Sequence, residues 1–200
     1  MKQVTINLFS FSELTEKAQR KALDDFKNQP HYPYGEWYDF VKSDFHTILE
    51  LIGFYNIDSY FSGFCSQGDG ASFSANYSYK KGCLKAVKKY APLDKGLHEI
   101  VKALVSYMKR YNWLLECAIT TQGIYCHSNT MRFNWDLNGS YCFDWRYDSD
   151  ESEIEQLFKD LADWYYNQLE KEYEHQMSDE YIKELIAINN YSFLDSGELY

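Results

Sequence analysis

The chain has 200 residues, of which 45% are hydrophobic and 25% charged, so that it can bury a large core and is not a disordered chain. No apolar run reaches the roughly 18 residues of a membrane span, and the first residues lack the hydrophobic stretch of a signal peptide. The net charge is −10, and residues 148–200 alone carry −12, with fifteen acidic residues and three lysines. We therefore expect a cytoplasmic protein without membrane contact and with an acidic C-terminal region.

The five cysteines indicate buried free thiols. Their number is odd, no two form a CxxC pair, and a closed zinc site takes four ligands, usually in two close pairs. We therefore expect no disulfide frame, no metal site and no other cofactor. The cysteines are Cys65, Cys83, Cys117, Cys126 and Cys142.

The N-terminal quarter of the chain predicts one strand and two helices. The alternating apolar residues of KQVTINLF predict an opening strand over residues 2–9. A helix with apolar residues at helical spacing follows, and either Ser12 or Thr15 supplies its N-cap. After a break that contains two prolines, a second amphipathic helix is expected over residues 36–52, with Gly53 as its C-cap.

From residue 54 onward the apolar residues recur with a period of two, which is typical of strands. We expect strands over residues 54–64 and 71–80, joined by a glycine-rich loop, and then a helix over residues 93–111. The segment LLECAITTQGIYCHS, residues 114–128, predicts a hairpin that turns at its Gln-Gly pair.

A second hairpin is expected from the segments TMRFNWDL and YCFDWRY. A two-residue Asn-Gly turn sets apolar residues opposite polar ones, whereas a three-residue loop over residues 138–140 pairs aromatic residues with each other. We therefore expect the three-residue loop, with Gly139 at positive φ. The other face of this hairpin gathers polar side chains that are candidates for partner binding: Arg132, Asn134, Asp136, Asp144 and Arg146.

The C-terminal region is predicted to be helical. A long helix is expected over residues 151–175, and Ser178 caps a final helix that precedes a polar tail. Together the elements predict a single α+β domain over residues 1–200. We expect an antiparallel sheet with hairpins, covered by about five helices, and an acidic helical subregion over residues 148–200.

The loop GFCSQGDGASF, residues 63–73, is the first candidate site. No helix pattern follows this loop and it lacks a Walker lysine, so a phosphate-binding function is disfavoured. Gln67 and Asp69 have two interpretations: they bind a ligand, or they close the turn by hydrogen bonding to local backbone. The closed turn is the favoured interpretation.

No catalytic motif is recognisable in the sequence. No spacing supports a pair of a cysteine and a histidine for nucleophilic catalysis. His46 is near Lys42 and Glu50 on the polar side of its predicted helix, so we expect a solvated histidine.

Two charged regions are further candidates for partner binding. The lysines of residues 80–89, beside three tyrosines, suit a nucleic-acid backbone, but the net negative charge and the lack of a nucleic-acid-binding motif disfavour this partner. The long C-terminal helix displays acids instead, and a rigid acidic helix can occupy a basic groove that normally holds nucleic acid. The competing interpretation is an ordinary solvated face. The candidate acids are Asp163, Glu170, Glu172 and Glu174.

Three stretches resemble a family of small phage and prophage proteins, some of which are labelled antitoxin of a toxin–antitoxin stability system. These stretches are FSELTEKAQRKAL, SGFCSQGDGASF with its SQGDG block at residues 66–70, and LEKEYEHQMSDEYIKELIAINNYSFLDSGEL. The resemblance implies a mobile element, in which small acidic proteins often neutralise host defences or toxins by binding them. It carries over no catalytic residues.

The sequence thus leads to one expected function and one alternative. We expect a non-catalytic protein that binds and inhibits a host defence effector or toxin in the bacterial cytoplasm, in the manner of an anti-CRISPR protein or an antitoxin. The alternative is an enzyme or binding protein that acts on nucleotides or nucleic acid through residues 63–73 and the basic stretch 80–89.

Overall fold

The computed structural model describes all residues except 1–2, 4, 31 and 138–147. Contacts between Cα atoms divide the chain into two compact units, which are described separately below. One unit comprises residues 1–38 and 171–200, and the other comprises residues 39–170. The single domain over residues 1–200 stays a prediction.

The smaller unit packs two helices from opposite ends of the chain against each other. These helices are α1 (Glu16–Lys27) and α6 (Asp179–Ile188). The N-cap of α6 is Ser178, as predicted, and that of α1 is Thr15, one of the two predicted candidates. The Thr15 hydroxyl accepts from an N–H 3.3 Å away and the Ser178 hydroxyl from one at 3.2 Å. The core between the helices is formed by Leu14, Ala18, Ala22, Leu23, Phe26, Ile182, Ile186 and Phe193.

The predicted opening strand over residues 2–9 is wrong for the residues that the structure describes. Residues 3 and 5–8 form no strand, and only Phe9 exchanges backbone hydrogen bonds, at 2.9 Å each, with Phe193. Ile6 and Leu8 remain 50% and 44% exposed. An alternating segment forms a strand when a neighbouring strand pairs with several of its residues, and this segment meets a single bridge.

The larger unit contains a four-stranded antiparallel sheet in the order β1-β2-β3-β4. The strands are β1 (Phe54–Phe61), β2 (Ala71–Ser78), β3 (Leu115–Thr121) and β4 (Met131–Leu137). This sheet and the helices around it make the protein an α+β fold, as predicted. The described part of the chain has six α-helices where the sequence predicted about five.

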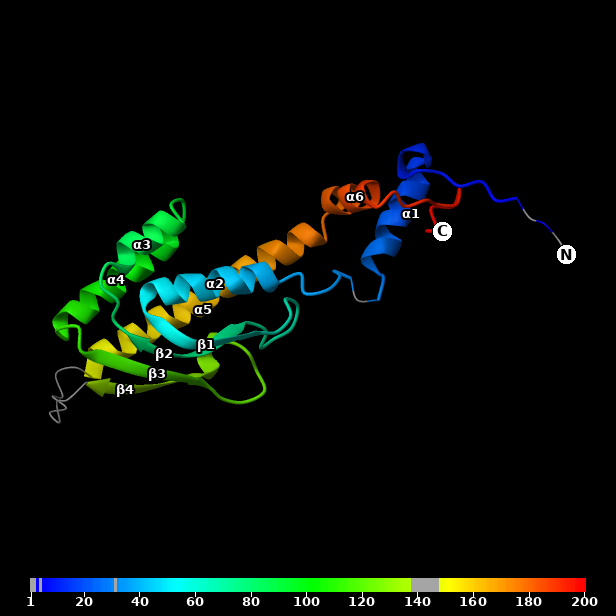
Figure 1. Cartoon of the computed structure of the whole chain (residues 1–200). Helices are drawn as coiled ribbons and strands as arrows, with labels where there is room; N and C mark the ends of the chain where they lie inside the picture. The colour runs from blue at the N-terminus through cyan, green and yellow to red at the C-terminus, as the bar shows by residue number, and fades with distance from the viewer. Residues whose placement is uncertain (1–2, 4, 31, 138–147) are drawn as a thin grey trace. The chain divides into compact units, whose positions relative to one another are not determined.

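Helices cover one face of this sheet. Figure 1 shows α2 (Asp39–Ile52) and the part of α5 (Asp148–Gln176) that belongs to this unit lying along that face. The rings of Phe45 from α2 and Tyr165 from α5 stack at 4.3 Å between centroids, and Phe158 of α5 packs on Phe54 and Tyr77 of the sheet at 5.1 Å. Aromatic residues thus form the centre of the core. The helices α3 (Cys83–Tyr90) and α4 (Lys95–Arg110) complete the unit.

The hairpin predicted over residues 114–128 is wrong. β3 pairs instead with β4, with Glu116 opposite Asp136 and Ala118 opposite Asn134, and residues 122–130 form the connection. An alternating pattern gives the faces of a strand but does not identify its partner, because any neighbour of matching polarity satisfies it. The first strand of the second predicted hairpin is β4, as expected, whereas the loop with Gly139 and the return strand fall on residues outside the described part.

One helix boundary also differs from prediction, and one helix was not predicted. The helix expected from residue 36 begins at Asp39. The helix α3, which was not predicted, occupies much of the basic stretch 80–89. Gly53 does end α2, at φ +124°, as expected.

Candidate functional site

A first loop, residues 62–70, connects β1 to β2 and is held closed by its own groups. The Ser62 N–H donates to the Gly70 carbonyl at 3.0 Å across the base of this loop. At its tip, Oδ2 of Asp69 accepts from the N–H groups of Cys65 at 2.9 Å and Ser66 at 2.6 Å. Asp69 therefore closes the turn, which is the interpretation that the sequence favoured.

A second loop, residues 122–130, connects β3 to β4 and contacts the first loop at Gly70. A Cβ atom at Gly70 would lie 2.6 Å from Cβ and 2.9 Å from Cα of His127. Glycine is therefore required at this position because the two backbones approach closely. Within the second loop, the carbonyl of His127 accepts from the N–H of Thr130 at 2.8 Å and from its hydroxyl at 2.7 Å.

Helix α5 contributes a third wall. The Tyr166 hydroxyl donates to the carbonyl of Gly63 at 2.9 Å, and its ring lies 5.3 Å from the ring of Phe64. Burial, and next the negative charges of Asp69 and Glu170, raise the pKa of Tyr166. Tyr166 therefore keeps its proton and fastens the first loop to α5.

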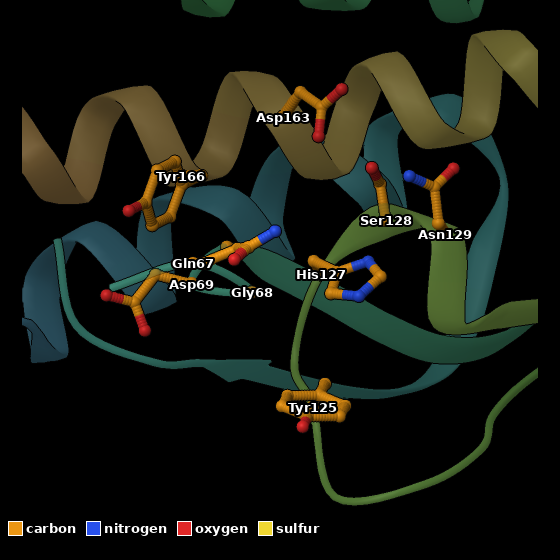
Figure 2. A pocket seen from close by; sticks show the side chains of 10 residues that line it. Gln67, Gly68, Asp69, Tyr125, His127, Ser128, Asn129, Asp163 and Tyr166 are labelled. Atoms are coloured by element: carbon orange, nitrogen blue, oxygen red, sulfur yellow. The ribbon is translucent and has the colours of Figure 1, made fainter. Parts of the chain in front are cut away.

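These three walls enclose an open cavity of about 660 Å³, called the loop cavity below. Figure 2 shows α5 on one side, the first loop and His127 in the middle, and Tyr125 on the side opposite α5. The lining residues are Gln67, Gly68, Asp69, Gly70, Tyr125, His127, Ser128, Asn129, Asp163 and Tyr166.

The lining is polar and acidic. Asp69 and Asp163 contribute two carboxylates, and no lysine or arginine of the described chain lines the cavity. Asp163 is exposed and forms no ion pair with a described residue. The charges of this lining oppose the binding of an anion such as a phosphate group and favour a neutral or cationic ligand.

The structure brings together part of the predicted acidic surface. Gln67, Asp69 and Asp163 line the loop cavity, and Glu170 follows Asp163 by seven residues, which places both acids on one side of α5. Glu172 and Glu174 belong to the part of α5 in the smaller unit, where the Glu172 carboxylate accepts from the Gln176 amide at 2.7 Å.

The predicted polar face on β4 is a separate surface. Phe133 and Trp135 of β4 pack on Phe158 of α5. The alternate residues Arg132, Asn134 and Asp136 are therefore on the other face of the sheet, where they are exposed, and none of them lines the loop cavity. Asp144 and Arg146 lie outside the described residues.

The basic stretch 80–89 is also separate. Its lysines at positions 81, 85, 88 and 89 are exposed on and around α3, and none lines the loop cavity. The Lys80 ammonium donates to the carbonyl of Glu50 at 2.8 Å near the C-terminus of α2, where a cation is favourable.

His46 is not the solvated histidine that the sequence predicts. It is half-buried and its Nε2 forms a 2.9 Å hydrogen bond with the Ser59 hydroxyl of β1. Burial, followed by the positive charge of Lys42, lowers its pKa, whereas Asp58 and Glu50 raise it by smaller amounts. His46 therefore links α2 to the sheet in its neutral form.

Sequence reasoning missed half of the cavity. Tyr125, His127, Ser128 and Asn129 carried no recognised motif, and Tyr166 was not singled out on its helix. The only sequence signal was a polar segment directly after a strand.

In the described part of the chain, no helix is long and apolar enough to cross a membrane, and no group of three or more His, Cys, Asp or Glu residues is placed to hold a metal ion.

Comparison with known proteins identifies a family. The family described as "Domain of unknown function (DUF8835)" matches residues 37–179, which is more than half of the chain and includes every residue that lines the loop cavity. No curated protein and no solved structure matches the chain. The chain therefore belongs to the DUF8835 family.

Proposed function

We propose that this protein acts without catalysis, as a phage- or prophage-encoded protein that binds and inhibits a host defence effector or toxin. Its partner presents a basic surface, of the kind that normally holds nucleic acid. The protein occupies that surface with its own acids, in the manner of an anti-CRISPR protein or an antitoxin.

One observation carries this proposal: two candidate regions that are distant in the sequence form one acidic surface. Asp69 from the first loop and Asp163 of α5 line the same cavity, and the charge of Glu170, two turns further along α5, acts on Tyr166 in its wall. These acids are called the acidic surface below. The first loop is fixed in place by Asp69 and Tyr166, so little conformational entropy is lost when a partner binds it.

The alternative function, an enzyme or binding protein that acts on nucleotides or nucleic acid, has less support. It needs the glycine-rich loop and the lysines of residues 80–89 to hold phosphates together. Those lysines do not line the cavity, and its carboxylates repel phosphate.

The test is capture of the partner from a bacterial lysate, followed by affinity measurements with the purified partner. The double variant Asp163→Lys/Glu170→Lys is expected to bind roughly 30-fold or more weakly, because like charges then face each other. Wild-type affinity should also fall as the salt concentration rises. The matched comparison is Glu172→Lys/Glu174→Lys, which makes the same charge change elsewhere on the same helix. If only this second pair lost affinity, the acidic surface would not be the binding site.

A further inference from the structure

The loop cavity has the charge of a site for a cation. Of its two carboxylates, Asp69 directs one oxygen into its own loop, so that it contributes mainly a negative potential. Asp163, on the wall that α5 forms, has no ion pair with a described residue and is available for direct contact. A positive group that enters the cavity is attracted by both.

The cavity also offers hydrogen-bond acceptors beside Asp163. Ser128 is only 9% exposed, lines the cavity, and its hydroxyl has no hydrogen-bond partner among the described residues. This hydroxyl is not among the buried side-chain atoms that lack a partner, so it reaches the open space of the cavity, where it can accept a hydrogen bond from a ligand. The side-chain carbonyls of Gln67 and Asn129 are two further acceptors in the lining. A ligand with several N–H groups satisfies this arrangement.

Two tyrosine rings complete the site. Tyr125 is 58% exposed, and its ring contacts the position of Gly68, where an added Cβ would lie 3.3 Å away. Tyr166 lines the wall on α5 with its hydroxyl already donated to Gly63. Tyrosine faces attract cations, and a planar guanidinium stacks on them better than an ammonium group does.

From these observations we propose that the loop cavity binds an arginine side chain of the partner protein. Arginine supplies a fixed charge, five N–H donors and a flat stacking surface, whereas lysine supplies three donors on a point charge. The cavity, at about 660 Å³, is large enough for the whole side chain. This inference rests on the proposed function, because it names the chemistry with which the acidic surface recognises its basic partner.

The test uses the full-length protein and three small probes: Nα-acetyl-arginine methylamide, its citrulline analogue and its lysine analogue. Citrulline has the shape of arginine without the charge. Binding is followed by the amide signals of Gly68, Gly70 and Asn129 in NMR titrations. The arginine probe is expected to shift these signals at millimolar concentration, the lysine probe less, and the citrulline probe hardly at all. Equal shifts with the citrulline probe, or no shift with the arginine probe, would overturn the proposal.

A matched pair of variants locates the contact. Asp163→Asn removes the charge that faces the cavity and is expected to weaken binding of the arginine probe roughly 10- to 100-fold. Asp160→Asn removes a charge three residues away, at a position outside the lining, and should leave binding within about twofold. Equal effects of the two would contradict a contact with Asp163.

These outcomes also separate this inference from the proposed function. If the captured partner binds the wild-type protein but the arginine probe does not, the inference fails and the inhibitor function stands. If the probe binds and no partner is retained, the inhibitor function fails and the cavity is a site for free arginine-like ligands. Free L-arginine, compared with the blocked probe, identifies that case because only a site for the amino acid itself needs the free termini.

Discussion

The contact between the two loops at Gly70 gives the sharpest prediction. In Gly70→Ala, the new methyl group would lie 2.6 Å and 2.9 Å from Cβ and Cα of His127, and one of these atoms belongs to the backbone. Gly70 is buried, so the second loop has to move as a whole. Overpacking of this kind costs about 1–3 kcal/mol of unfolding free energy.

Gly96→Ala is the matched control for this variant. Gly96 lies in the first turn of α4, and the nearest atom to its added Cβ is Oδ1 of Asp94 at 3.6 Å, an ordinary contact. Alanine at a helical position is expected to stabilise the protein by roughly 0.5 kcal/mol. Urea unfolding, followed by tryptophan fluorescence and circular dichroism together, measures both changes. If Gly70→Ala unfolded at the urea concentration of the wild-type protein, the close approach of the loops would be refuted.

Three further predictions concern single side chains. Asp69→Ala is expected to lower the unfolding free energy by about 1 kcal/mol, because two loop N–H groups lose a charged acceptor. The unfolding free energy of Asp163→Ala should stay within about 0.5 kcal/mol of the wild-type value. If urea unfolding showed the larger loss for Asp163→Ala, the closed turn would be contradicted. The pKa of His46 is lower in the folded protein than in the unfolded chain, where it is about 6.5. As the pH falls below this value the unfolded chain takes up a proton more readily than the folded protein, so the folded protein loses stability. Unfolding at pH 7.5 and 5.5 should therefore show a larger loss for the wild-type protein than for His46→Gln, and equal losses would refute this. Burial raises the pKa of Tyr77 well above its ordinary value, and its hydroxyl has no hydrogen-bond partner among the described residues. Removal of this hydroxyl therefore breaks no hydrogen bond in the described part of the chain, and Tyr77→Phe is expected to have a melting temperature no lower than that of the wild-type protein in a thermal scan.

Local sequence patterns predicted much of the fold. The apolar residues Ile154, Phe158 and Leu161 recur at helical spacing in the sequence of α5, and all three are buried. Period-two alternation gave β1 and β2, and polar N-cap residues gave the starts of α1 and α6. These features depend on neighbours within a few residues, which a sequence displays directly.

Features that depend on distant residues could not be predicted. The partner of β3 is a strand beyond a polar connection, and the pattern of β3 suits either neighbour. The helix α3 was missed for a local reason, since its two buried residues, Cys83 and Val87, are too few to show a helical repeat.

The loop cavity was predicted only in part because it also depends on distant residues. Its walls come from segments about 60 and 100 residues after the first loop in the chain, and Tyr166 reaches Gly63 across 103 positions. The sequence named Gln67 and Asp69 on one wall and Asp163 on another without indicating that they share a cavity. Packing of the loops brings them together, and no spacing rule for a single segment describes that packing.

Hydrogen–deuterium exchange of the protein, free and bound to its captured partner, tests the central claim most directly. The claim is that the acidic surface at the loop cavity is where the partner binds. Binding is expected to slow exchange in residues 62–70 and 122–130 and in the turns of α5 that carry Asp163 and Glu170. Protection confined to β4 or α3, with these three segments unchanged, would contradict the claim.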